Sequence, residues 1–212
     1  MKFSGELHKV KLINFSIEKE ELNGMLPEKL KVLDYKGRAL ISMVDVQLKK
    51  MSASSFLPSF AYRHVAFRLV IDDSEYSKEG PKGIYFLKSF SSNAAMVLGG
   101  NLVANYNLCL SKFQAENNGL KISLDNQNIQ YRFDESKVSE NEELFQAIKR
   151  IDRAYAFIND KVKITRITRK EWPIEPLNIV DFKTNFFKSA KLEGAFEVKK
   201  VIDYIWEKPV QI

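Results

Sequence analysis

Hydrophobic and polar residues alternate with a period of two along most of the chain, which is the pattern of β-strands with one buried face. Residues 62–71 show it most clearly, because one face is apolar throughout, and we predict that this face lies in the core. Residues 83–90 are apolar on both faces, as expected for a strand in the middle of a sheet. The same pattern predicts further strands at residues 8–15, 30–33, 39–48, 104–113, 120–124, 129–133, 154–158, 162–168 and 196–206.

Short helices interrupt this pattern. Residues 91–98 favour a helix that begins at a serine cap and ends at the Gly99-Gly100 pair. Residues 142–150 have an apolar stripe at helical spacing, and residues 18–22 form a shorter helix. Many antiparallel strands with few short helices predict a mostly β fold of the α+β class. We expect an antiparallel β-barrel or a sandwich, because both leave few exposed strand edges.

Composition places this pattern in one globular domain. The chain has 212 residues, of which 45% are hydrophobic and 12% aromatic, and this is too apolar for a disordered chain. Because no linker or shift in composition divides it, we predict a single domain over residues 1–212. No apolar stretch reaches the length of a signal peptide or a membrane span, and Cys109 is the single cysteine. We therefore expect a cytoplasmic protein without membrane contact.

Charge adds little to this picture. Lys and Arg total 33 against 27 Asp and Glu, a formal net charge of +6 that is spread along the chain. The densest basic stretch, residues 161–170, places Lys161, Lys163 and Arg169 on one face, which we interpret as a solvated edge strand protected by lysines. A nucleic-acid or protein interaction module is the alternative, with nucleic acid disfavoured because no aromatic stacking platform lies nearby. A homo-oligomer stays open.

Motifs for common cofactor chemistry are absent from the sequence. It has no glycine-rich phosphate loop, no His-Glu-x-x-His, no Gly-x-Ser-x-Gly and no Cys-x-x-Cys. A three-histidine metal centre would need more histidines than His8 and His64. We therefore predict no cofactor and no metal.

The strand at residues 62–71 supplies two candidate ligand-binding residues. His64 and Arg68 lie on the face opposite its apolar one, so they line a cavity or meet solvent. The planar guanidinium group of Arg68 suits a ligand carboxylate, and a structural salt bridge is the alternative use of the same group.

The strand predicted at residues 104–113 has a small polar face that includes Asn105, Asn107 and Cys109. These side chains suit a pocket wall that hydrogen-bonds a ligand. They equally suit a packed face whose amides bind backbone groups. We interpret Cys109 as a plain buried thiol, because a nucleophilic cysteine needs a base beside it.

Four segments, taken in order, carry a family resemblance. They are Leu26-Pro27 before the Asp34 to Gly37 turn, Lys82-Gly83-Ile84-Tyr85-Phe86 with Ser92-Asn93-Ala94-Ala95 after it, Arg153 among aromatic residues, and Trp172-Pro173-Ile174-Glu175-Pro176. Together they span most of the chain and resemble the motifs of the YqjF-like family, also called domain of unknown function 2071.

That family is distantly similar to the acetoacetate decarboxylases, so the resemblance implies a decarboxylase-like β-barrel. Those enzymes use a Schiff-base lysine, and the resemblance places Asn107 and Leu108 on their lysine pair. Because an amide cannot form an imine with a ketone, we predict no Schiff-base decarboxylase at that position. We hypothesise instead a barrel that binds a small polar or carboxylate metabolite. The candidate contacts are Arg68, His64, Asn107, Asn105 and Cys109.

Whether the protein is an enzyme stays open, and Lys88 is the alternative catalytic candidate. It is predicted to share a strand face with Ile84, Phe86 and Phe90, where burial would favour the neutral, nucleophilic amine. The alternative is a lysine at the end of a strand whose ammonium group reaches water.

Overall fold

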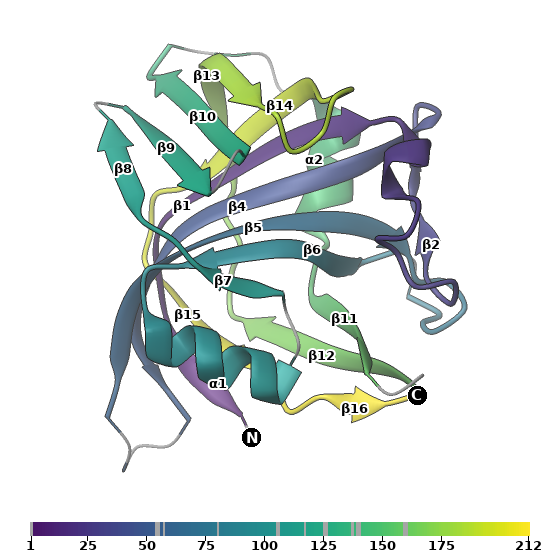
Figure 1. Ribbon diagram of the computed structural model, residues 1–212, viewed down its shortest axis with the longest axis vertical. Coiled ribbons are helices and arrows are strands. Elements are labelled where there is room, and N and C mark those ends of the chain that lie inside the picture. The colour runs from purple at the N-terminus through teal and green to yellow at the C-terminus, as the bar shows by residue number, and fades with distance from the viewer. Residues whose placement is uncertain are drawn as a thin grey trace.

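Strands dominate the computed structural model (Figure 1), which describes residues 2–212 except 54, 55, 57, 80, 105, 106, 117, 125, 126, 137, 139, 140, 159 and 160. The strands are β1 (Phe3–Ile17), β2 (Lys31–Val32), β3 (Asp34–Tyr35), β4 (Arg38–Ser52), β5 (Phe60–Asp72), β6 (Gly83–Ser91), β7 (Leu108–Leu110), β8 (Phe113–Glu116), β9 (Gly119–Leu124), β10 (Gln127–Asp134), β11 (Arg153–Ile158), β12 (Lys161–Arg169), β13 (Glu175–Thr184), β14 (Lys191–Val198), β15 (Ile202–Trp206) and β16 (Val210–Gln211). The described helices are the 3-10 helix η1 (Lys19–Leu22) and the α-helices α1 (Ala94–Ala104) and α2 (Glu142–Lys149).

Seven strands close into a barrel, in the order β4-β5-β6-β11-β12-β15-β1, with β1 pairing back onto β4. Neighbours in this ring are antiparallel except for β6 and β11, which are parallel. The mostly β, barrel-like fold predicted from the sequence is therefore confirmed.

A bent first strand connects the barrel to a second layer. Residues 3–7 of β1 pair with β15, whereas residues 10–16 pair with β14. The β1–β4 register shifts between these halves, where Lys9 has a φ of 51°, and such a bulge bends a strand. From β14 the sheet continues through β13, β10, β9 and β8, seen at the top of Figure 1.

The two faces of β5 belong to two different hydrophobic clusters. Val65, Phe67, Leu69 and Ile71 are at most 1% exposed and pack outside the barrel, in a cluster shared with residues of β9 and β10. This apolar face was correctly predicted to be core. The opposite face turns inward, where Ala66 and Val70 join the cluster inside the barrel. The inner face therefore positions the polar residues of β5 at the barrel interior.

The helix predicted to end at the Gly99-Gly100 pair instead continues to Ala104. Gly100 serves close packing rather than termination, because a Cβ atom there would lie 2.4 Å from Leu108 Cδ1. The strand predicted at residues 104–113 is correspondingly wrong in extent, since β7 covers only Leu108–Leu110 and β8 starts at Phe113.

The C-terminal strands also differ from the prediction. The single strand expected at residues 196–206 is divided into β14 and β15, which pair with the two halves of bent β1. The pattern missed β13, whose Pro176 argues against a strand interior. Pro176 is tolerated because it is the second residue of the strand, opposite Phe196.

Candidate functional site

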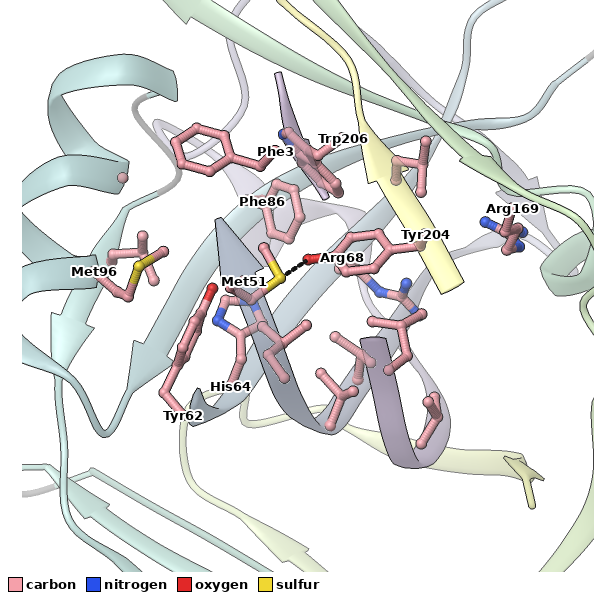
Figure 2. Close-up of a pocket in the computed structure, with 18 of the residues that line it drawn as sticks. Phe3, Met51, Tyr62, His64, Arg68, Phe86, Met96, Arg169, Tyr204 and Trp206 are labelled. Atoms are coloured by element: carbon pink, nitrogen blue, oxygen red, sulfur yellow. Dashed lines mark hydrogen bonds between the residues drawn. The ribbon is translucent and has the colours of Figure 1, made fainter. Parts of the chain in front are cut away.

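A cavity of about 480 Å³ occupies the barrel interior, and most side chains that line it are apolar. Val44, Leu48, Ile84 and Phe86 are among those contributed by the barrel strands. Figure 2 shows Met96 of α1 and Arg169 of β12 at opposite sides of this space. A cavity of this size and character is typical of small-molecule sites.

Arg68 is the buried cation of this cavity. It is 9% exposed, and its Nε and Nη2 atoms donate to the backbone oxygen (3.0 Å) and the Oγ atom (2.8 Å) of Ser42 on the neighbouring strand. Glu207 is the one carboxylate among the described lining residues, and it pairs with Lys2. Within the described part of the chain Arg68 has no ion pair, so the salt bridge weighed from the sequence is not observed there.

Burial and the nearby Arg169 lower the pKa of Arg68 to about 9, so the guanidinium group stays charged at neutral pH. An unpaired buried charge is costly, because the apolar surroundings replace only part of its hydration. A bound anion would supply the missing partner. The position of Arg68 is thus better explained by binding than by stability.

Arg169 is a second cavity arginine, which sequence reasoning assigned to a solvated strand face. Its guanidinium group stacks 4.2 Å from the ring centre of Trp172 and donates to the backbone oxygen of Ile151. Burial lowers its pKa to about 10. Trp172, three residues downstream, was the available signal, because arginine stacks readily on aromatic faces.

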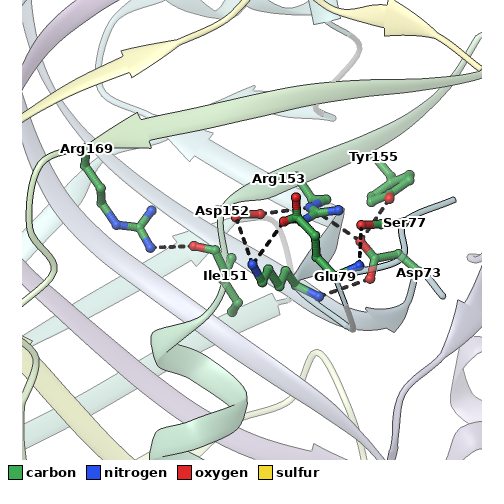
Figure 3. A network of polar contacts seen from close by, with 9 residues as sticks. Asp73, Ser77, Glu79, Ile151, Asp152, Arg153, Tyr155 and Arg169 are labelled. Atoms are coloured by element: carbon green, nitrogen blue, oxygen red, sulfur yellow. Dashed lines mark hydrogen bonds and ion pairs between the residues drawn. The ribbon is translucent and has the colours of Figure 1, made fainter.

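The surrounding polar network leaves Arg169 without a carboxylate partner among the described residues (Figure 3). Asp152 is nearby, but its carboxylate contacts Arg153 (2.8 Å) and Lys82 (3.8 Å). Backbone hydrogen bonds from Asp152 to Lys82 and from Ile167 to Asp152 fix the segment that carries the Ile151 oxygen. The network therefore orients Arg169 without neutralising it.

His64 lines the same cavity as Arg68, on the β5 face for which alternation left a cavity and solvent as alternatives. Its Nδ1 atom is buried and has no hydrogen-bond partner among the described residues. The ring packs edge-on against Tyr62, with 6.4 Å between ring centroids. Burial and the charge of Arg68 lower the pKa of His64 to about 4, so the imidazole is neutral at pH 7.

We expect His64 to make the protein less stable in mild acid. Between its folded pKa of about 4 and the ordinary value of 6.5, the unfolded chain binds a proton that the native state does not. Stability therefore falls as the pH decreases through this window, by about 2 kcal/mol. Urea denaturation of wild type and His64→Gln at neutral pH and near pH 4.5 measures this loss of stability. The variant has no imidazole at position 64, so its stability should lack this contribution to the pH dependence. If the difference in free energy of unfolding between wild type and His64→Gln were the same at both pH values, the prediction would be contradicted. His8→Gln is the control for loss of a histidine.

The polar face predicted around Asn107 does not form as expected. Asn107 has a φ of 50°, and its amide donates to the backbone oxygens of Phe86 (3.1 Å) and Leu87 (3.4 Å). Cys109 packs partly buried against the outer cluster. Neither side chain lines the cavity, and Asn105 lies outside the described residues. The inward residue on β7 is Leu108.

Lys88 lies on the other side of the sheet from the cavity. Phe67 pairs with Lys88 and Arg68 pairs with Phe86, so Leu87 is an extra residue that shifts the register. Such a bulge reverses which face later residues occupy, and the face expected for Lys88 with Phe86 is therefore wrong. Its Nζ atom donates to Gln127 Oε1 (2.9 Å) and lies 5.1 Å from the ring centre of Phe186. The described lining residues include no lysine.

The inward position of Leu108 makes a prediction about amine chemistry. We expect Leu108→Lys to form an imine with pyruvate that borohydride traps as a mass increase, because apolar walls favour the neutral amine. Wild type and Asn107→Lys, whose side chain is directed at the backbone of β6, are the controls and should stay unmodified. Trapping in Asn107→Lys alone would contradict the observed orientation.

Comparison with solved structures defines the class of fold. Over its whole length the chain resembles acetoacetate decarboxylase from Legionella pneumophila, with a TM-score of 0.67, 12% identity and 87% of that chain covered. It resembles the enduracididine biosynthesis enzyme MppR in complex with pyruvate over 99% of its length and 89% of that chain, with a TM-score of 0.63 and 10% identity. An acetoacetate decarboxylase-like enzyme from Sphingomonas wittichii RW1 matches all of the chain and 92% of its own length, with a TM-score of 0.63 and 8% identity. The protein therefore has an acetoacetate decarboxylase-like fold.

A family model gives the finer assignment. The model of domain of unknown function 2071, described as an uncharacterized conserved protein, matches residues 5–205, and the chain belongs to this family. The resemblance seen in the sequence is thereby confirmed. A search of curated proteins finds no match. None of the described helices is both long and apolar enough to cross a membrane.

Proposed function

We propose that this protein binds a small organic acid with an apolar body inside its barrel, with the ligand carboxylate at Arg68. The observation that carries the proposal is the buried Arg68 and the half-buried Arg169 at an apolar cavity, neither with a carboxylate partner among the described residues. The similarly folded MppR has been solved with pyruvate, a small carboxylate, which supports a carboxylate ligand.

The shape and polarity of the cavity narrow this ligand. Arg68 Nε and Nη2 are engaged by Ser42, and Nη1 makes no hydrogen bond to a described residue. The remaining wall is mostly aliphatic and aromatic, so an acid with an apolar body buries more surface than a polyhydroxylated one. Catalysis is not part of the proposal.

Calorimetry with straight-chain acids from butanoate to decanoate, each compared with its primary amide, tests the proposal. We expect at least one acid to bind, the amide to bind more weakly, and Arg68→Ala to lose about tenfold or more in affinity, as for a charge-assisted hydrogen bond. Arg166→Ala, which removes an exposed arginine of β12, is the matched control. No binding by any acid, or equal loss in both variants, would refute the role of Arg68.

We further propose that the protein acts in the cytoplasm as a single domain. The lone Cys109 suits a reducing compartment, and the barrel and its second layer share one continuous sheet. Fractionation of cells that express the tagged protein tests the location.

A further inference from the structure

The cavity has a second polar region, separate from its two arginines. It consists of the Tyr62 hydroxyl and the His64 imidazole, which come from the same strand as Arg68. Figure 2 shows both side chains on the side of the cavity nearer Met96, away from Arg169. Apolar side chains occupy the wall between the two regions.

His64 Nδ1 is a buried polar atom with no partner among the described residues. The fully buried Oγ atom of Ser89 has none there either, although Ser89 is not among the described residues that line the cavity. Ser89 pairs with Ala66, and Ser91 pairs with His64, so Ser89 turns to the same inner face one step along the sheet. Buried polar groups are nearly always hydrogen-bonded, because leaving one unpaired costs its full desolvation. A hydrogen-bonding group supplied from the cavity would satisfy His64.

The spacing along β5 sets the shape of a ligand that meets both regions. His64 and Arg68 are four residues apart, so their Cα atoms are separated by roughly 13 Å along the strand. Ala66, the inward residue between them, is small and packs in the cluster inside the barrel. One small polar group cannot contact both ends, so an extended ligand is required.

We propose that the ligand is a hydroxylated acid, with its carboxylate at Arg68 and a hydroxyl group near the other end, recognised by His64 and Tyr62. This inference rests on the proposed function of the same cavity. A hydroxyl group fits because it both donates and accepts, whereas neutral imidazole offers one acceptor nitrogen and a phenol can do either. An amine fits less well, because it would bring a third cation into a cavity that already holds two arginines.

Matched acid pairs test the proposal by calorimetry. We expect 8-hydroxyoctanoate to bind about five- to tenfold more tightly than octanoate, and 3-(4-hydroxyphenyl)propanoate more tightly than 3-phenylpropanoate. Tyr62→Phe, which removes a single oxygen atom, and His64→Leu should each reduce this preference, measured as the ratio of the affinities for the hydroxylated and the plain acid on the same variant. His8→Ala is the control for loss of a histidine.

The outcomes separate this inference from the function on which it rests. If plain and hydroxylated acids bind equally, or if the preference survives both substitutions, the second region does not select a hydroxyl group, although Arg68-dependent binding stands. If no acid of either kind binds, the proposed function itself fails.

Discussion

Ligand-free Arg68→Met is expected to be more stable than the wild type, by about 1–3 kcal/mol, while losing acid binding. Arg68 is a buried charge without a carboxylate partner among the described residues, and replacing such a group by an apolar side chain of similar length is commonly stabilising. Methionine adapts to irregular apolar space and would pack within the cavity wall. The loss of two hydrogen bonds to Ser42 offsets part of this gain. A residue that lowers stability and raises binding is typical of a functional site.

Urea denaturation without ligand, followed by calorimetry with the best acid, measures both effects on one protein. Destabilisation by 2 kcal/mol or more would show that Arg68 has a structural role in the barrel. Increased stability together with unchanged acid binding would place the carboxylate elsewhere, with Arg169 as the next arginine to substitute.

The same substitution at Arg153 is expected to destabilise the protein by about 3–5 kcal/mol. Arg153 is 4% exposed, like Arg68 in burial, but it contacts three carboxylates, those of Asp152 (2.8 Å), Glu79 (3.1 Å) and Asp73 (3.6 Å) (Figure 3). Asp73 is fully buried, so among the described residues Arg153→Met would leave its carboxylate with the Tyr155 hydroxyl and the Lys82 backbone amide as hydrogen-bond partners. The cost arises because one partner of a buried pair cannot be removed without stranding the other.

Denaturation of Arg153→Met beside Arg132→Met provides the comparison. Arg132 is half exposed and lies 3.6 Å from Asp181, and its loss should change stability by no more than about 0.5 kcal/mol. If Arg153→Met were as stable as the wild type, the network would contribute nothing to holding the loop before β6. If Arg68→Met raises the free energy of unfolding and Arg153→Met lowers it, the two results would distinguish a binding arginine from a structural one.

The described cavity wall includes no lysine, so the likeness to the decarboxylases does not extend to a lysine on that wall. The likeness to the decarboxylases is at 13% identity or less and concerns the fold. Arg68, Arg169 and the apolar wall of this chain are the features that favour an acid ligand.

Local alternation was enough to predict most strands and the two faces of β5. Burial of Val65, Phe67, Leu69 and Ile71 needs only a sheet with one side covered, and any sequence neighbour of each residue lies on the other face. The same rule places His64 and Arg68 together on the opposite face, but it does not decide whether that face meets a cavity or solvent. The tight turn between β3 and β4 was likewise predicted from the sequence. In the structure Lys36 and Gly37 adopt the positive φ that such a turn requires.

Contacts between residues distant in the chain settled the remaining features. The bulge at Leu87 moves Lys88 out of the cavity, Gly100 packs closely against Leu108 within the longer α1, and Arg169 turns inward onto Ile151 and Trp172. Each of these three features depends on residues that the fold brings into contact. The periodicity of the sequence does not specify which residues those are. Alternation thus placed Arg68 on the face opposite the apolar one, whereas only closure of the sheet turned that face to an apolar cavity, beside a second arginine that has no carboxylate partner among the described residues.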